Sequence, residues 1–237
     1  MKSWQEDLLC ITERPTCEQE VFEKLENAAT ALGFTHCAYG LRLPHPLSNP
    51  KTIMLNNYPQ GWRERYASQG YLKADPTVLH GRQSQKPLIW SDNVFEPARK
   101  LWEEARSFGL CVGWAQSSLD AVDVGGMLTL SRPHDPLTSA ELESQEIKMR
   151  WLVNIAHLSL SRIFNQKVVG QRQPDLTGRE IEILKWTGDG KTSGEISDLL
   201  SVSENTVKFH IKNAVAKLQT ANKTAAVVRA AMLGLLN

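Results

Sequence analysis

The 237-residue sequence lacks features that define several large classes of protein. No apolar run approaches the roughly 20 residues that a membrane-spanning helix needs. The first residues, 1–12, lack the apolar centre of a signal peptide. The sequence also contains no internal repeat and no low-complexity tract. We therefore expect a cytoplasmic protein with no membrane segment.

Cysteine is scarce and scattered. The four cysteines are Cys10, Cys17, Cys37 and Cys111, with no C-x-x-C pair and no paired histidine spacing. Zinc sites and disulfide frameworks have recognisable cysteine spacings. We therefore expect reduced thiols in the core or at the surface, with no metal site and no cofactor.

The overall composition and length are typical of a globular chain of two domains. Hydrophobic residues make up 41% and charged residues 22% of the sequence, and the length exceeds one typical domain. Residues 166–237 hold 10 Lys and Arg against 7 Asp and Glu, a balance of +3, and the rest holds 17 against 19, a balance of −2. A basic module on a mildly acidic body favours a sensor joined to a DNA reader.

The strongest local pattern runs from Leu176 to Leu218. Thr192 and Glu195 have the spacing of a capping box, which begins one short helix. Ser203 is a natural N-cap for a second helix, because its hydroxyl can accept from an unpaired backbone N–H. Two short helices joined by a three-residue turn are typical of a helix-turn-helix.

The helix after Ser203 has two distinct faces at helical periodicity. Lys208 and Lys212 lie with Asn205 on the polar face. Such lysines are usually only solvated charge, but the second helix of this motif enters the major groove, where lysines meet phosphates and guanine edges. Phe209 lies near this face and either packs against the preceding helix or contacts a thymine methyl. The apolar stripe consists of Val207, Ile211, Ala214, Val215 and Leu218.

This stretch resembles the DNA-binding domain of the LuxR family of bacterial transcription regulators. The shared strings are L-T-x-R-E-x-E-x-L-x-W, G-K-T-x-x-E-I and S-x-x-T-V-x-F-H-x-x-N. The resemblance implies an all-α, four-helix domain over residues 175–237 that binds double-stranded DNA. The residues before it, 166–174, have the composition of a linker, with Gly170 and Pro174. The DNA-binding residues that the resemblance implies are Lys191, Asn205, Thr206, Lys208 and Lys212.

Residues 1–165 alternate helical and extended patterns. This order predicts an α/β fold, an α/β/α sandwich around an antiparallel sheet. Ile147 and Leu158 belong to the apolar surface of the last helix. We expect helices over 4–12, 16–32, 59–69, 75–81, 93–108 and 138–164, and extended segments over 36–43, 51–57, 88–90, 111–119 and 124–132.

An aromatic cluster marks this N-terminal part. Tyr58, Trp62 and Tyr66 are spaced by four, so on one helix they share a face. A carboxylate near such a wall, that of Asp75, must be paired, because its desolvation costs several kcal/mol. The cluster suits an apolar ligand that bears an amide, but it also fits an ordinary core in which Asp75 caps a helix.

The strings Y-P-x-x-W-x-x-x-Y, D-P-T, I-W, L-W-x-x-A-x-x-x-G-L and G-x-L-T-L are similar to the autoinducer-binding domain of quorum-sensing LuxR-family members, which binds N-acyl-homoserine lactones. The resemblance implies that Trp62 bonds the lactone carbonyl and Asp75 the amide N–H. It implies that Tyr58 and Thr129 address the amide carbonyl. The ligand-binding residues that it implies are Tyr58, Trp62, Tyr66, Asp75, Thr77, Trp90 and Thr129.

The sequence therefore predicts a ligand-controlled transcription regulator, not an enzyme, that binds a pseudo-palindromic site as a homodimer. A response regulator with the same DNA-binding domain, or control by another ligand, is the alternative. A response regulator would need a doubly wound domain with clustered acidic residues, and Asp75 has no such neighbours. An enzyme with Cys37 or Cys111 as nucleophile is a further alternative, although no histidine lies in a partner motif.

Overall fold

The structure is a computed structural model that describes residues 17–43, 47–119, 125–169 and 174–236. The chain divides into two compact units, with the boundary between Lys167 and Val168. Within the described residues, no helix combines the length and the apolar character that crossing a bilayer requires. The helix expected over 4–12 lies outside the described residues, and so does Cys10.

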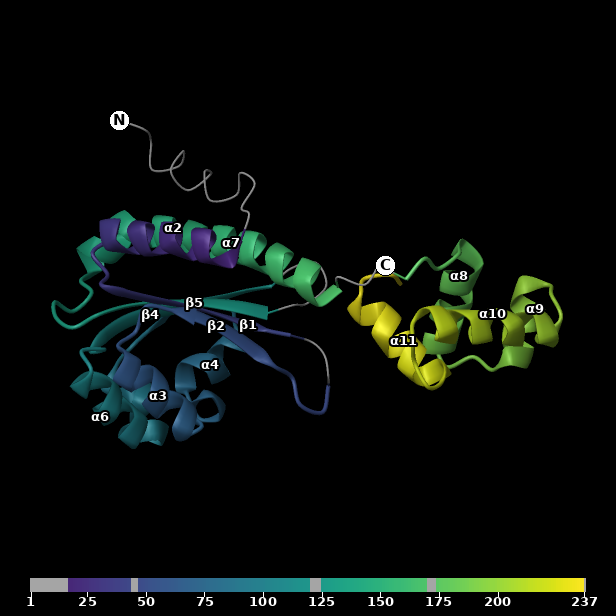
Figure 1. The fold of residues 1–237 in the computed structure, drawn as a ribbon, viewed down its shortest axis with the longest axis horizontal. Coiled ribbons are helices and arrows are strands. Elements are labelled where there is room, and N and C mark those ends of the chain that lie inside the picture. The colour runs from purple at the N-terminus through teal and green to yellow at the C-terminus, as the bar shows by residue number, and fades with distance from the viewer. Residues whose placement is uncertain (1–16, 44–46, 120–124, 170–173, 237) are drawn as a thin grey trace, which may run out of the picture. The chain divides into compact units, whose positions relative to one another are not determined.

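A five-stranded antiparallel sheet forms the centre of the first unit, with strand order β2-β1-β5-β4-β3 (Figure 1). The β1–β2 hairpin and the run β3–β4–β5 are local pairings. The pairing of β1 with β5, in which Ala38 lies opposite Thr129, joins them into one sheet. The strands are β1 (His36–Arg42), β2 (Thr52–Asn56), β3 (Leu88–Ile89), β4 (Val112–Leu119) and β5 (Gly125–Arg132).

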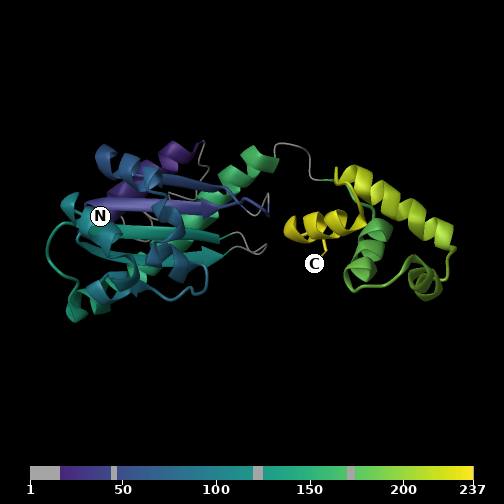
Figure 2. The same ribbon diagram turned by 90° about the horizontal axis from the view of Figure 1, so that it is seen from below.

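Helices cover both faces of this sheet. Helices α2 and α7 lie over one face, and α3, α4 and α6 lie over the other (Figures 1 and 2). The α/β/α sandwich predicted from the sequence is confirmed. The helices of this unit are α2 (Glu18–Ala31), α3 (Gln60–Ser68), η1 (Tyr71–Lys73), α4 (Pro76–Gly81), α5 (Asp92–Phe95), η2 (Glu96–Ala98), α6 (Arg99–Ser107) and α7 (Ser139–Val169).

The two faces of the sheet have different neighbours, because successive residues of a strand point to opposite sides. On one face the Tyr39 hydroxyl lies 2.8 Å from Nδ1 of His157 on α7. A Cβ at Gly126 would collide with both side chains, so glycine is what lets α7 approach this closely. We call this the α7 face. The opposite face carries Thr129 and is called the site face.

Two helices differ from the sequence prediction. The single helix predicted over 93–108 is divided into α5, η2 and α6. Pro97 lies at this break, since proline has no N–H to donate and its ring clashes with the preceding turn. In addition, α7 continues to Val169, past the predicted end at Phe164.

The apolar residues of α7 lie on two sides of the helix. Met149 and Leu152 are buried. Ile147 and Leu158, predicted on the same apolar surface, are 64% and 62% exposed instead. The helix therefore carries an outward apolar stripe in addition to the face that it packs on the sheet.

The second unit is the all-α domain that the sequence predicts. Thr192 and Glu195 form a capping box at the start of α9, and Ser203 caps α10 by accepting from the Thr206 N–H. Gly190 has a φ of +87°, a conformation that suits glycine. The four helices are α8 (Gly178–Gly188), α9 (Ser193–Leu200), α10 (Glu204–Lys217) and α11 (Lys223–Met232).

A buried carboxylate ties the start of α8 to the end of α10. Glu180 is only 2% exposed and accepts from the Thr177 N–H and from the Lys217 ammonium, each at 2.8 Å. Burial alone would raise the pKa of Glu180, but the hydrogen bonds from Lys217 and Thr177 outweigh it and the pKa is lowered. Glu180 thus both caps a helix and braces the domain.

Candidate functional site

Aromatic rings from α3 and η1 form a wall over the site face. Trp62 is 3% exposed and meets Tyr66 edge to face, with 5.6 Å between ring centroids. Tyr71 stacks on Trp62 at 6.1 Å, and Phe108 lies 5.8 Å from it. The wall is therefore apolar in body but carries phenol and indole groups that can donate hydrogen bonds.

Tyr58 joins this wall from outside α3, so the three rings do not share one helix face, although their spacing by four would allow it. Pro59 is extended, with φ −49° and ψ 138°, and α3 begins after it. A residue that precedes proline is disfavoured in the α region, so the helix cannot include Tyr58. Tyr58 instead packs edge-on to His36, with 6.0 Å between the rings.

The Asp75 carboxylate is buried beside this wall at the N-cap of α4. Its Oδ1 accepts from the Thr77 N–H at 2.8 Å and the Thr77 hydroxyl at 2.7 Å. Its Oδ2 accepts from the Tyr66 hydroxyl at 2.9 Å. Burial raises the pKa of Asp75, while the hydrogen bonds from Thr77 and Tyr66 partly oppose that rise. The Val78 N–H adds to these donors, and Asp75 therefore caps a helix while its carboxylate oxygens can each accept more than one hydrogen bond.

The phenols around Asp75 remain neutral donors. Burial raises the pKa of Tyr66, and the Asp75 charge adds to that rise. Burial and the same charge raise the pKa of Tyr58. The site thus combines one buried acceptor with several O–H and N–H donors.

Trp90 and Thr129 lie on the site face as well. The Trp90 indole covers Gly113, where any Cβ would collide with the ring. It packs edge-on against Phe95 at 5.7 Å and Trp102 at 6.0 Å. Within the described part of the chain, its Nε1 is buried without a hydrogen-bond partner. Thr129 is 5% exposed and projects from β5.

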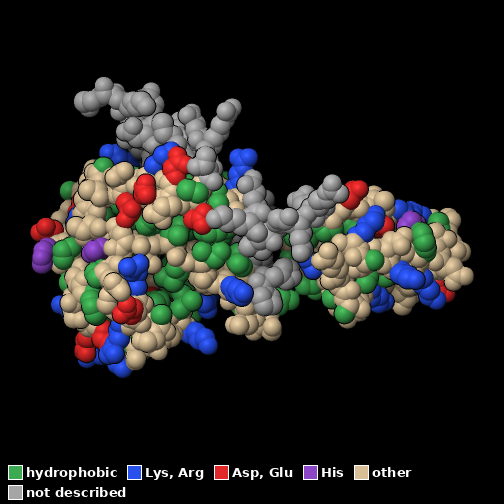
Figure 3. Space-filling view, in the orientation of Figure 1, with side chains coloured by type: hydrophobic (Ala, Val, Ile, Leu, Met, Phe, Trp, Pro, Cys, Tyr) green, Lys and Arg blue, Asp and Glu red, His purple; other side chains and the backbone are tan. Residues whose placement is uncertain are grey.

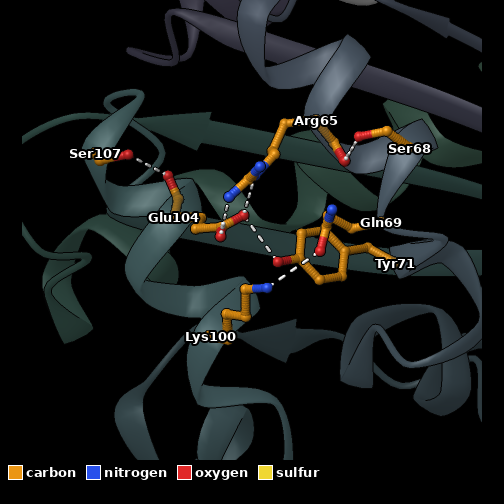
Figure 4. Close-up of polar contacts among 7 residues, drawn as sticks. All are labelled: Arg65, Ser68, Gln69, Tyr71, Lys100, Glu104 and Ser107. Atoms are coloured by element: carbon orange, nitrogen blue, oxygen red, sulfur yellow. Dashed lines mark hydrogen bonds and ion pairs between the residues drawn. The ribbon is translucent and has the colours of Figure 1, made fainter.

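An ion pair braces the wall from outside, and sequence reasoning missed it (Figure 4). Glu104 of α6 accepts from Arg65 Nε and Nη2, both at 2.8 Å, and from the Tyr71 hydroxyl at 2.8 Å. Lys100 adds a bond to Gln69 at 3.1 Å. These contacts hold α3 and η1 against α6. They join residues more than 30 positions apart, so no local motif could reveal them.

The outer face of α10 is the second candidate site. Asn205, Lys208 and Lys212 are exposed on it, and Figure 3 shows Lys and Arg side chains on the surface of this unit. Lys208 Nζ lies 2.8 Å from Glu204 Oε1. Phe209 is 59% exposed and its ring lies 5.5 Å from that of His210, so it is not buried against the preceding helix.

Like Lys208, two further residues predicted to bind DNA have partners within the domain. The Thr206 hydroxyl lies 2.8 Å from Ser203 Oγ at the N-cap of α10. The Lys191 ammonium lies 3.7 Å from Glu195 in an exposed pair. Exposed pairs of this kind are weak, so Lys191 can exchange its partner for a phosphate at little cost.

Both units match known families. Residues 18–160 match the autoinducer binding domain, and residues 174–230 match the bacterial regulatory proteins of the luxR family. A small-molecule sensor followed by a helix-turn-helix domain defines a ligand-responsive transcriptional regulator. The chain belongs to the LuxR family of bacterial regulatory proteins.

Similar proteins agree with this assignment. The transcriptional activator AnoR of Acinetobacter nosocomialis is 48% identical over 100% of both chains. The quorum-sensing regulator RhlR of Pseudomonas aeruginosa is 39% identical over 92% of this chain and 90% of its own. The crystal structure of Escherichia coli SdiA has a TM-score of 0.84 at 36% identity, with 99% and 98% of the chains covered. SdiA in complex with octanoyl-rac-glycerol has a TM-score of 0.83 at 35% identity, with 100% and 99% covered.

The sheet topology separates this family from the response-regulator alternative. All four strand pairings are antiparallel, whereas a doubly wound domain is built on parallel strands. The protein is a transcriptional regulator of the quorum-sensing type, and the response-regulator alternative was wrong.

We predict that Glu104→Gln destabilises the protein in a pH-dependent way. Hydrogen bonds from Arg65 and Tyr71 lower the pKa of Glu104 to about 2 from its ordinary 4.5. The stabilisation is therefore complete above about pH 4.5 and is lost as the pH falls toward 2. Melting temperatures should differ most between wild type and variant near pH 6, and the gap should narrow in acid. Glu103→Gln, at an exposed neighbour, is the control; a gap that stays constant with pH contradicts the prediction.

Proposed function

We propose that the small molecule bound by the sensor unit is an N-acyl-homoserine lactone, and that it controls a homodimer on promoter DNA. The observation that carries this proposal is the buried Asp75 carboxylate set into a wall of indoles and phenols. An isolated buried anion is costly, so a site that keeps an open acceptor position beside apolar rings suits an apolar ligand with an N–H donor.

The donors and acceptors of the site complement this ligand class. An acyl-homoserine lactone offers one N–H donor and several carbonyl and ester acceptors. Asp75 Oδ2 would accept the amide N–H, beside the Tyr66 hydroxyl that it already accepts. Trp62 would donate to the lactone carbonyl, and Tyr58 and Thr129 to the amide carbonyl. The surrounding rings would enclose the acyl chain.

A second ligand class is suggested by the complex of SdiA with octanoyl-rac-glycerol. A monoacylglycerol has an acyl chain and a polar head, but it lacks the amide N–H. It would therefore leave the acceptor position on Asp75 unused. For this reason we favour the acyl amide and include the monoacylglycerol as a comparison ligand.

Ligand binding can control DNA binding through stability. A ligand that completes the core of the sensor stabilises the folded dimer, by about 2.7 kcal/mol at 100 times its dissociation constant. A dimer presents two α10 helices, which suits two half-sites one helical turn apart. The outward stripe of α7, with Ile147, Trp151 and Leu158 at least half exposed, supports self-association of two sensor units.

The regulator is proposed to act in the cytoplasm, where its DNA is, and to have no catalytic activity. Its relatives are transcriptional regulators. Burial and the charge of Glu26 raise the pKa of the Cys37 thiol to about 12. A thiol that stays protonated at neutral pH is a poor nucleophile, so the enzyme alternative gains no support from Cys37.

Asp75→Asn should weaken lactone binding about 10- to 100-fold, because one charge-assisted hydrogen bond is lost. Thermal shifts of the full chain with acyl-homoserine lactones of varied length, and with octanoylglycerol, measure the effect. Asp135→Asn makes the same change at an exposed position and should leave the shifts unaltered. No shift of the wild type with any lactone would remove the ligand proposal.

Lys212→Ala should weaken binding to a random-sequence DNA duplex and reduce its salt dependence. Each lost phosphate contact lowers the slope of log K against log salt by about 0.9. Fluorescence anisotropy from 50 to 200 mM salt, with saturating lactone, measures both quantities. Lys73→Ala removes the same charge from an exposed site on the sensor unit and should leave the slope unchanged. Equal slopes for wild type and Lys212→Ala would rule out a phosphate contact.

The double substitution Ile147→Ser, Leu158→Ser should shift the ligand-bound protein from dimer to monomer. Both side chains are more than 60% exposed, so the change removes apolar contact area without opening the core. Light scattering after size exclusion measures the mass. Leu119→Ser, at another exposed apolar position, is the control and should remain dimeric. A double variant that keeps the dimer mass would exclude this stripe as the interface.

A further inference from the structure

A row of polar groups crosses the site face beyond Thr129. Ser131 lies two residues further along β5, so it faces the same side of the sheet. Its register partners are His36 on β1 and Gly113 on β4. The Trp90 indole covers Gly113. Strand pairing therefore sets Trp90, Ser131 and His36 side by side.

Trp90 Nε1 and His36 Nδ1 are buried and lack a hydrogen bond to the described residues. Ser131 Oγ is buried between them, with the Tyr58 hydroxyl as its side-chain hydrogen-bond neighbour. Ser131 is 0% exposed. Buried polar atoms in folded proteins nearly always have a partner. Two unpaired atoms that flank a buried hydroxyl in one row therefore indicate a polar group that enters from outside the chain.

This row adjoins the proposed acyl-amide site. The Tyr58 ring meets His36 edge-on, with 6.0 Å between centroids. A side-chain hydrogen bond with Ser131 lowers the pKa of Tyr58 in part, against the larger rise that burial causes. Ser131 lies about 7 Å from Thr129 along the strand, given about 3.3 Å per residue. Ser131 is therefore the next polar group along this face after Thr129, which is proposed to bind the amide carbonyl.

We propose that Ser131, flanked by His36 and Trp90, is a second polar anchor that binds the ester oxygens of the ligand head group. This inference rests on the proposed function and deepens it. The Ser131 hydroxyl and the Trp90 N–H donate to the ring oxygens, which are acceptors only. The anchor thus makes the site selective for a lactone over a carbocyclic head of the same size.

A matched pair of ligands isolates this contact. The probes are an N-acyl-homoserine lactone and the corresponding N-acyl-cyclopentylamine, both with the acyl length that gives the largest thermal shift. They share the chain, the amide and a five-membered ring, and differ in the ring oxygens. The measured quantity is the dissociation constant of the cyclopentylamine divided by that of the lactone, obtained on the full chain by calorimetry. This ratio reports recognition of the ring oxygens alone.

Ser131→Ala should reduce this ratio about five- to tenfold, the effect of one hydrogen bond. Ser131→Cys nearly keeps the side-chain volume but has a weaker donor, so it should also reduce the ratio. Because its volume is nearly unchanged, a reduced ratio in this variant is not explained by a folding defect. His36→Phe keeps the ring against Tyr58 and should shift the ratio in the same direction. The control is Ser118→Ala, whose buried hydroxyl already bonds Asn154 on α7 at 3.1 Å.

Three results would overturn the anchor. They are a ratio unchanged in Ser131→Ala, an equal loss in Ser118→Ala, and a wild type that binds both ligands equally well. A wild type that binds neither ligand instead removes the proposed function, and the anchor with it. The two failures are therefore distinguishable.

Discussion

The sensor unit depends on the burial of one charge, the Asp75 carboxylate, among aromatic rings. Removing a carboxylate from water is costly, and the structure offsets that cost with donors from Thr77 and Tyr66. These bonds fix the start of α4 and the orientation of Tyr66 on α3. The same residues that stabilise the anion therefore set the geometry of the proposed ligand site.

The two faces of the central sheet have different roles: one packs against α7, and the other carries the proposed ligand site. On the α7 face, Tyr39 and His157 meet over Gly126 in close packing. On the site face, Trp90 Nε1 and His36 Nδ1 are buried without a hydrogen-bond partner among the described residues.

Local sequence patterns, such as caps and residue spacing, predicted most of the helices and strands. The capping box at Thr192 and the N-cap at Ser203 are single-helix features, and both could be read from spacing. The β1–β5 pairing and the Glu104–Arg65 bridge depend on long-range contacts that no local pattern encodes. The helix prediction over 93–108 was wrong at Pro97, where proline interrupts the helix. Ser131 carried a usable signal, since it follows Thr129 at the period of a strand, but the family pattern drew attention to Thr129 alone.

The continuity of α7 has a mechanical consequence. Its 31 residues form one unbroken helix, about 45 Å long at 1.5 Å per residue. It is bonded to the sheet through Asn154 and His157, near its middle. A rod held in this way acts as a lever. If it pivoted by about 5° about His157, its last turn, about 18 Å away, would move by about 1.6 Å, so a repacking of the sheet too small to alter the fold would be transmitted to the end nearest the next domain in sequence.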